Sequence, residues 1–387
     1  MPDNPMLSRA FVLAFFANFL HSLAFFGYLH FPGYLTEVGA TELMIGLITG
    51  TMAAAAIALR PGVGVLLDRR GRRVVARVGS VIHLLATLCY LTVDGIGPWI
   101  FVVRLLHGAG EAMLFSVLFT IAADVVPPAR RTEGIALFGV SGLLPMSLAG
   151  LLGDMVLARG GYPDLFIATA VVAALGGLCS WPLPDSRPPV RDDAPPPRPF
   201  LTVVMQPSLR PLWLMGMSFA VAVASYFTFL KTYVESTGIG SMGLYYSVYS
   251  ASAIALRLGL GWVPDRIGPR RALGPAATAT VTGLVLLPLA AGDVGIAVSG
   301  LLCGAGHAFV FPILSALVVT RSSDHERGAA LSMFTALFDL GLLLGAPLLG
   351  ALLERTGYTP MFTAAAAVAA VGGIAYGVWD RRVAPYG

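Results

Sequence analysis

The sequence predicts an all-α membrane protein in which twelve transmembrane helices form two pseudo-symmetric six-helix bundles. Three observations predict this fold class: an apolar composition, a series of long apolar runs, and a repeat that relates the two halves. Of the 387 residues, 56% are hydrophobic and only 12% are charged, with a mean hydropathy of +0.78. Roughly a quarter of a typical soluble domain is charged. No soluble core of this length buries so much apolar surface, so we expect lipid around the helices.

The apolar runs place the helices and divide the chain. A helix needs about 20 apolar residues to cross the hydrocarbon layer of a membrane. Six runs precede a Pro-rich, charged segment that has nothing to bury, and six follow it. We therefore expect an N-terminal six-helix bundle at 1–183, a cytoplasmic linker at 184–208 and a C-terminal bundle at 209–387. The runs lie at about 9–33, 42–67, 74–94, 98–126, 133–158, 163–183, 210–235, 240–263, 271–291, 294–320, 327–353 and 358–379.

The arginines predict the orientation. Of 24 arginines, 19 lie at the two termini, in the linker or in loops on the same side, and two lie in the opposite loops. Because cytoplasmic loops carry the excess of positive charge, both termini are expected in the cytoplasm. The net charge of +4 therefore reflects topology, and no nucleic acid is expected as a partner. The three cysteines lie inside apolar runs without metal-ligand or disulfide spacing, so we expect no metal and no cofactor.

The two halves of the chain repeat one another. The segment 60–73 matches 257–270 at an offset of 197, with Arg, Gly and Asp at equivalent positions. Gly108-Ala-Gly110 matches Gly304-Ala-Gly306, and Gly161-Tyr162 matches Gly357-Tyr358, both at an offset of 196. Three matches in register indicate duplicated bundles. Parallel repeats with a binding site between them near the membrane midplane are a transporter architecture.

The loop after the second run carries a more specific signal. The pattern Gly64-x-x-x-Asp68-Arg69-x-Gly71-Arg72-Arg73 resembles the signature loop of the major facilitator superfamily, in the position that this family uses. The resemblance implies the major facilitator fold, and a gating role in which Asp68 latches onto the start of the run at 327–353. The alternative is a purely electrostatic anchor made by the arginines. The expected gating residues are Gly64, Asp68, Arg69, Gly71, Arg72 and Arg73 in the first half, and Asp265, Arg266, Gly268 and Arg270 in the second.

The run at 98–126 carries the densest set of ionisable residues. Arg104, His107 and Glu111 stand at i, i+3 and i+7, so they share one helical face. The order Arg104-x-x-His107-Gly108 resembles a motif of drug–proton antiporters, in which Gln stands where His107 is. An imidazole titrates near neutral pH and ionisable groups inside a membrane are costly, so we expect proton coupling at Glu111, Asp339 and His107. The alternative is a structural Arg–Glu pair.

Other polar and aromatic residues lie at membrane depth and are expected to line a substrate cavity. Each has a structural alternative: a packing histidine, a local pair of Lys231 with Glu235 one turn later, or lipid-facing aromatic rings. His83 belongs to a run that the family places at the periphery, so it is expected to be structural. The expected cavity residues are Arg104, His21, Lys231, His307, Tyr226 and Phe227.

These patterns predict a secondary transporter that moves a small amphipathic solute by alternating access, through proton-coupled export. The same-fold alternative is proton-coupled uptake of an organic anion such as a carboxylate, for which Arg104 and Lys231 supply positive charge. No metalloprotease, serine-hydrolase or nucleotide-binding motif is present, so no enzyme is expected. The resemblance implies a monomer in the inner membrane of a bacterium, with protons, lipid and a small-molecule substrate as partners.

Overall fold

Glycines and hydroxyl side chains mark the start of several helices of this protein. The computed structural model describes residues 7–127, 130–186, 205–322 and 327–383. Ser8 accepts a hydrogen bond from the N–H of Phe11 at 3.2 Å, which caps the first helix. Gly71 and Gly268, with φ of 91° and 93°, occupy the equivalent turns of the two halves. This φ is strained for residues with a Cβ, so both turns require glycine.

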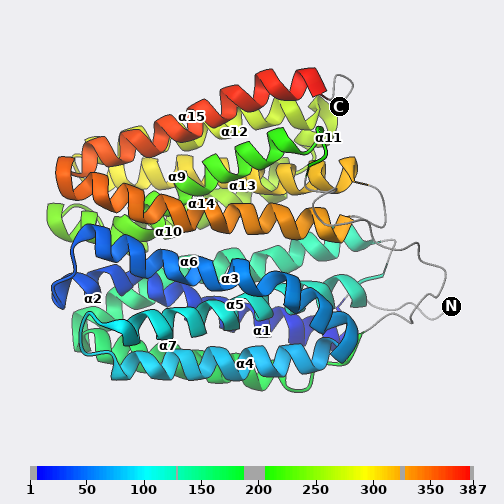
Figure 1. Cartoon of the computed structure of the whole chain (residues 1–387), viewed down its shortest axis with the longest axis horizontal. Coiled ribbons are helices and arrows are strands. Elements are labelled where there is room, and N and C mark those ends of the chain that lie inside the picture. Colours follow the sequence, from blue (N-terminus) through cyan, green and yellow to red (C-terminus); the bar gives the residue numbers. More distant parts are fainter. Residues whose placement is uncertain (1–6, 128–129, 187–204, 323–326, 384–387) are drawn as a thin grey trace. The chain divides into compact units, whose positions relative to one another are not determined.

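All the regular elements among the described residues are helices (Figure 1). The contacts between residues divide the chain into two compact units. Unit 1 comprises Met1–Ala40 and Thr51–Pro189, and unit 2 comprises Thr41–Gly50 and Val190–Gly387. The bundle boundaries expected from the sequence stay a prediction, and residues 187–204 of the expected linker lie outside the described residues.

Unit 1 is built from the first seven α-helices and two short 3-10 turns. In chain order these are α1 (Arg9–Gly27), η1 (Tyr28–His30), α2 (Phe31–Glu37), α3 (Glu42–Arg70), α4 (Arg72–Cys89), η2 (Tyr90–Thr92), α5 (Pro98–Val125), α6 (Arg131–Gly160) and α7 (Tyr162–Ser180). The start of α3 belongs to unit 2. Helix α1 packs on α5, α6 and α7, and α4 packs on α5 and α7.

Unit 2 holds the remaining helices. They are α9 (Arg210–Thr237), α10 (Met242–Leu260), α11 (Val263–Ile267), α12 (Pro269–Leu286), η4 (Leu287–Leu289), α13 (Asp293–Arg321), α14 (Arg327–Thr356) and α15 (Tyr358–Val383). Helix α9 is the most enclosed of the membrane-length helices and packs on α14 and α15. Helix α13 packs on α10 and α12.

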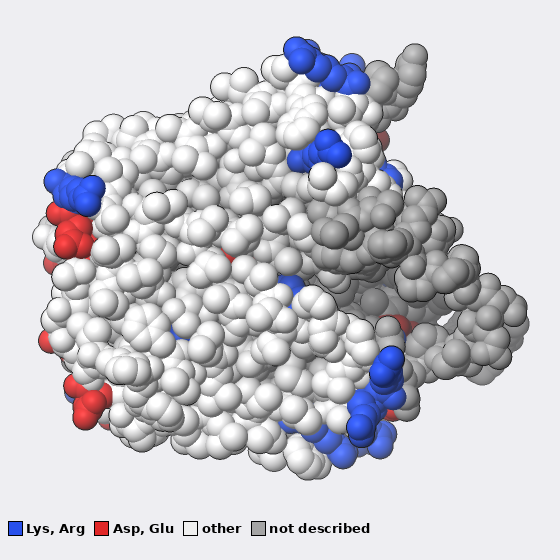
Figure 2. Space-filling model, viewed as in Figure 1, with Lys and Arg blue, Asp and Glu red and all other residues white. Residues whose placement is uncertain are grey.

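Eleven helical segments of the described residues are long and apolar enough to cross a membrane. Helix α10 is as long as α7 but less apolar, because it contains three tyrosines, three serines and Arg257. Figure 2 shows the charged side chains gathered near helix ends, while the lengths between are almost wholly uncharged. The all-α membrane architecture predicted from the sequence is confirmed.

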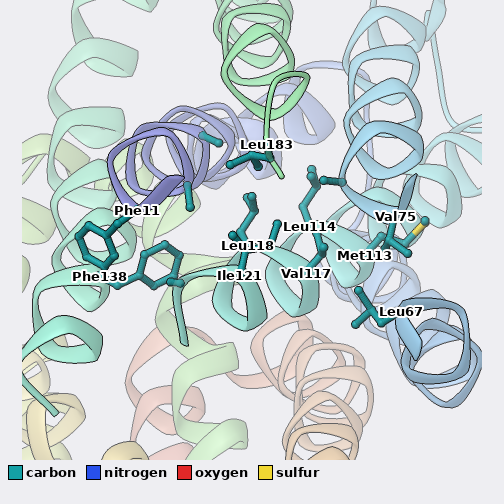
Figure 3. Packing of buried hydrophobic residues seen from close by; sticks show 14 of the residues in the cluster. Phe11, Leu67, Val75, Met113, Leu114, Val117, Leu118, Ile121, Phe138 and Leu183 are labelled. Carbon is teal, nitrogen blue, oxygen red and sulfur yellow. The ribbon is translucent and has the colours of Figure 1, made fainter. Parts of the chain in front are cut away.

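A continuous apolar core joins α1, α3, α4, α5 and α6 in unit 1. In Figure 3 the ring of Phe11 lies beside that of Phe138, and the ring centroids are 6.4 Å apart. Leu118 and Ile121 of α5 belong to the same cluster and are fully buried. Side chains from α5 thus fill the interior of the unit, and this packing fixes which face of α5 points inward.

The repeated Gly-Ala-Gly motif has the same role in both units. A Cβ on Gly108 of α5 would overlap the carbonyl oxygen of Met52 in α3, and a Cβ on Gly110 would lie 2.9 Å from the backbone nitrogen of His83 in α4. In unit 2, a Cβ on Gly304 of α13 would overlap the carbonyl oxygen of Tyr249 in α10. These glycines let backbones approach closely, which is a common means of packing helices in lipid.

Candidate functional site

The ionisable stripe predicted on the fourth run lies on α5. The side chains of Arg104 and His107 are buried, with 5% and 0% exposure, and Glu111 is half-buried. The stripe therefore enters the interior of unit 1 at its first two positions.

One phenol connects the cation and the imidazole of this stripe. Arg104 Nη1 donates to Tyr90 Oη at 3.1 Å, and Tyr90 Oη lies 3.1 Å from His107 Nδ1. The guanidinium of Arg104 also lies 5.4 Å from the ring centroid of Phe31, a cation–π geometry. An arginine has only donors, so Tyr90 accepts from Arg104, and the same phenol forms a second hydrogen bond with the imidazole of His107.

Three buried histidines follow one another from α5 to α4 to α1. The rings of His107 and His83 are stacked, with centroids 5.1 Å apart and planes inclined by 23°. His83 Nδ1 lies 3.0 Å from His21 Nδ1. None of the three rings is exposed by more than 2%. His21, one of the expected cavity residues, thus belongs to a hydrogen-bonded group inside unit 1.

Hydroxyl groups and glycines complete the surroundings of His21. Its Nε2 lies 3.1 Å from Ser80 Oγ on α4 and 3.2 Å from Ser180 Oγ on α7. A Cβ on Gly176 of α7 would lie 3.0 Å from His21 Nδ1, so glycine at this position leaves room for the ring. The sequence therefore supplies both the partners of the imidazole and the space that it occupies.

Sequence reasoning missed Tyr90 and gave His83 a structural role, although a signal was present. Ser80, His83, Thr87 and Tyr90 are spaced by three, four and three residues, which places them on one face of a helix. All four are buried. This polar stripe on α4 and η2 meets the ionisable stripe of α5, and the meeting of the two stripes marks the site.

Unit 2 contains an aromatic group around His307. Tyr249 hydrogen-bonds to His307 Nδ1, and its hydroxyl lies 3.3 Å from that of Tyr226. Tyr226 is fully buried and His307 is half-buried. Arg257 Nε donates to the backbone carbonyl of Ala308 at 3.2 Å, which anchors α10 to α13. Their role in a cavity stays a prediction.

The remaining expected site residues of unit 2 lie on α9 and α14. Lys231 is buried except for about a tenth of its surface, and its Nζ lies 3.0 Å from Glu235 Oε1, one turn later. Phe227 is half-buried, and its ring centroid is 5.3 Å from that of Tyr226. Asp339 is buried on α14. The roles expected for these residues stay predictions.

The signature loop of unit 1 is held by carboxylates. The N–H of Arg72 donates to Asp185 at 3.0 Å, and its guanidinium lies 3.3 Å from Asp124 at the end of α5. Arg73 Nε donates to the carbonyl of Leu183 at 2.9 Å. The Asp185 carboxylate lies where a Cβ of Gly71 would be. The side chain of Asp68 is not among those that the structure describes. Gly64 and Arg69 are exposed on α3.

The equivalent loop of unit 2 is held by a more deeply buried carboxylate. Asp380 at the end of α15 is only 1% exposed, and its carboxylate lies 2.6 Å from Arg270 Nε and 2.5 Å from Arg321 Nη1. Asp265 is exposed on α11, and the Arg266 guanidinium lies 5.5 Å from the ring centroid of Trp262. Only Gly268 and Arg270 of the expected set thus belong to the turn and its ion pairs.

These side chains form hydrogen bonds, and their chemical types are able to exchange protons. Imidazole, phenol, guanidinium and carboxyl groups lie within the membrane-length helices of unit 1. Among the described residues, no group of three or more His, Cys, Asp or Glu side chains is arranged to hold a metal ion.

Comparison with known proteins identifies a family profile and relatives that agree with one another. The profile of the Major Facilitator Superfamily matches residues 11–296 and 241–386. The MFS-type transporter YhhS of Escherichia coli K12 is 26% identical over 352 residues, covering 88% of this chain and 84% of its own. The staphylopine export protein of Staphylococcus aureus Mu50 is 25% identical over 344 residues, covering 84% of each chain.

A solved structure shows the same fold. A mutant of the nucleoside transporter NupG superimposes with a TM-score of 0.80 at 15% identity, covering 96% of this chain and 99% of its own. At that identity the likeness concerns the fold alone. Because the family profile covers nearly the whole chain and the fold agrees, this protein belongs to the Major Facilitator Superfamily of membrane transporters.

Proposed function

We propose that this transporter exports a small amphipathic solute in exchange for protons, by alternating access. The observation that carries the proposal is the stripe of Arg104, His107 and Glu111 on α5, inside a helix of membrane length. Ionisable groups at membrane depth are costly, and they typically mark ion pathways and proton relays.

Glu111 is the proposed coupling group, with Asp339 as the second candidate. Glu111 is half-buried, so its carboxyl group has both protein and accessible surface around it. A carboxyl group in such a position can bind a proton in one state of the transporter and release it in another. His107 lies one turn away on the same face, where it can take part in the exchange.

The direction of transport is supported by a relative. The staphylopine export protein aligns with 84% of this chain, and its printed name describes export. The proposal also includes gating by the two signature loops. It places both termini in the cytoplasm and treats the transporter as a monomer.

The proposal is tested in membrane vesicles with an imposed proton gradient. Inverted vesicles that are acidic inside should accumulate at least one member of an amphipathic panel made of ethidium, a bisbenzimide dye and tetraphenylphosphonium. Vesicles from cells that lack the protein serve as the control. Protons should leave the vesicles as the amphipathic compound accumulates. A protonophore should abolish this accumulation.

The uptake alternative predicts the opposite asymmetry. Right-side-out vesicles that are acidic outside would then accumulate a labelled aromatic carboxylate, and inverted vesicles would not accumulate the amphipathic panel. That result would overturn export. Equal fluxes with and without the gradient would overturn proton coupling in either direction.

A further inference from the structure

In unit 1, a polar chain consists of Arg104, Tyr90, His107, His83 and His21. The number of protons on each group assigns a direction to its hydrogen bonds. Arg104 donates to Tyr90 at 3.1 Å, and Nδ1 of His107, also at 3.1 Å, is the only other hydrogen-bond partner of this phenol among the described residues, so it is the acceptor available to the buried phenolic proton. A neutral imidazole has one N–H and one bare nitrogen. Since Nδ1 of His107 accepts, neutral His107 carries its proton on Nε2.

The protonated nitrogen of His21, at the other end of the polar chain, can be assigned in the same way. Ser80 Oγ donates to the carbonyl of Ala76 at 2.8 Å, and Ser180 Oγ donates to the carbonyl of Gly176 at 2.9 Å. Each hydroxyl has one proton, so both oxygens can only accept from Nε2 of His21. Neutral His21 therefore carries its proton on Nε2.

The assignment of His21 determines that of His83. Nδ1 of neutral His21 is bare, so it accepts from Nδ1 of His83 at 3.0 Å. His83 is then protonated on Nδ1, and its Nε2 carries a free lone pair. These tautomers are assigned from the hydrogen-bond network.

Two complementary atoms remain. Nε2 of His83, an acceptor, and Nε2 of His107, a donor, are both buried, and neither has a hydrogen-bond partner among the described residues. Buried polar atoms are nearly always hydrogen-bonded. The two rings are neighbours, stacked with centroids 5.1 Å apart. One hydrogen bond from His107 to His83 would join all donors from Arg104 to the serines in a single direction.

We propose that Tyr90, His107, His83 and His21 form a proton relay, whose link between the Nε2 atoms of His107 and His83 closes during transport. In one passage Tyr90 gives its proton to His107, His107 to His83, and His83 to His21, and His21 releases its proton to water that reaches it when the transporter opens. Tyr90 regains one proton from water that enters in the same way. One proton enters and one leaves, and each imidazole ends neutral with its proton on the other nitrogen. The relay rests on the proposed function, because it supplies a path for the coupled proton.

The charges around the relay favour passage through neutral rings. Arg104 and His107 share the phenol of Tyr90, so the Arg104 guanidinium lies close to His107 and opposes a second positive charge nearby. Tyr28 of η1 faces the ring of His107 at 4.8 Å between centroids, and its hydroxyl is engaged with Thr169 at 3.1 Å. Glu111 lies one turn further along α5. The relay therefore moves a proton without holding a lasting charge.

The tautomers can be measured directly. The chain has six histidines, so ¹⁵N-histidine labelling of the full protein in liposomes gives a simple spectrum. We expect Nε2–H tautomers for His21 and His107 and the Nδ1–H tautomer for His83, each assigned by its own substitution. One passage would reverse all three tautomers together, so a His83 ring protonated on the same type of nitrogen as His21 or His107 would overturn the relay.

The coupling role is tested with His83→Asn. The Asn side-chain nitrogen can keep the hydrogen bond to His21, but the titratable Nε2 is lost. Gradient-driven accumulation of the amphipathic panel should fall at least tenfold, while gradient-free exchange and the melting temperature stay near wild type. A structural role predicts a lower melting temperature with an unchanged pH profile, which would overturn the relay. His30→Gln is the matched control, because Gln can keep the hydrogen bond that His30 makes to Asp154 at 3.1 Å.

Failure of the relay and failure of the proposed function give different results. A wild-type protein without proton-driven flux contradicts the proposed function, and the coupling role of the relay with it. A wild-type protein that couples, alongside a His83→Asn variant with the same pH profile, contradicts the relay alone.

Discussion

At the scale of single residues, the buried carboxylate of Asp380 is compensated by two arginines. The carboxylate of Asp380 lies between Arg270 and Arg321, and Arg321 also donates to the carbonyl of Ser208 at 2.8 Å. Charges near a low-dielectric interior are stable only when they are paired and hydrogen-bonded. This ionic group joins the ends of α15, α12 and α13 with the segment before α9, so its contribution is to the packing of unit 2.

Replacing Asp380 by Asn should lower the stability of the protein. The change leaves two guanidinium groups without their shared anion, so we expect a loss of about 3 kcal/mol in the free energy of unfolding. A lower melting temperature of the purified variant in detergent would report this loss of stability. Asp293→Asn, at the exposed start of α13, is the control and should cost less than about 1 kcal/mol. Equal melting temperatures for the two variants would show that the ion pairs contribute little.

Glu111→Gln tests the coupling carboxylate. Gln keeps the shape of the side chain but cannot titrate, so proton-driven accumulation should be lost while solute binding and gradient-free exchange persist. Proton flux and solute flux should be measured together in proteoliposomes. A purely structural role for Glu111 predicts a lower melting temperature with intact coupling in the protein that survives.

The exposed Glu37 at the end of α2 provides the matched control for this experiment. Glu37→Gln removes the same kind of charge outside the polar chain and should leave the pH dependence unchanged. If Glu111→Gln still drives uphill transport with a normal pH dependence, the coupling role passes to Asp339 or to the histidines.

At the scale of helices, glycines control how closely backbones pack. In each unit the Gly-Ala-Gly motif faces two neighbouring helices, α3 and α4 in unit 1 and α10 and α12 in unit 2. Its two glycines are two residues apart, so they lie on different sides of the helix axis. One motif can therefore fix a helix against two partners, which explains why the repeat preserves both glycines.

Gly304→Ala should disturb the contact of α13 with α10. The added methyl group would overlap the Tyr249 carbonyl oxygen, which is backbone and cannot rotate away. We expect a loss of roughly 1–3 kcal/mol, the usual cost of overpacking, seen as a lower melting temperature. Gly377→Ala on α15 is the control, since nothing lies within 4 Å of its added Cβ. An unchanged melting temperature in Gly304→Ala would mean that α13 moves aside at little cost.

At the scale of the whole molecule, the arginine distribution predicts the topology. A single cysteine at Asp192, in a chain whose three native cysteines are replaced by alanine, should be protected from an impermeant thiol reagent in intact cells. Labelling should appear once the membrane is permeabilised. The reason is that a segment with many positive charges is retained in the cytoplasm. Strong labelling in intact cells would reverse the orientation.

The sequence by itself determined the fold class, because lipid leaves the backbone few alternatives. Every peptide group in the hydrocarbon must be hydrogen-bonded within its own segment, so an apolar run of sufficient length becomes a helix. The repeat added the relation between the halves, and the signature loop indicated the family. The face shared by Arg104, His107 and Glu111 also followed from helical spacing alone.

Only the tertiary structure decided which polar residues meet. His21 and His83 are 62 residues apart, and their contact depends on how α1 and α4 are rotated about their axes. That rotation is set by the apolar packing of the unit and by glycines such as Gly110 and Gly176, whose missing side chains leave the space that the two histidines occupy. The sequence shows the period of each stripe, but the direction in which a stripe faces is a property of the packed helices. The sequence therefore predicted only a structural role for His83, whereas the fold places this residue at the centre of the polar chain.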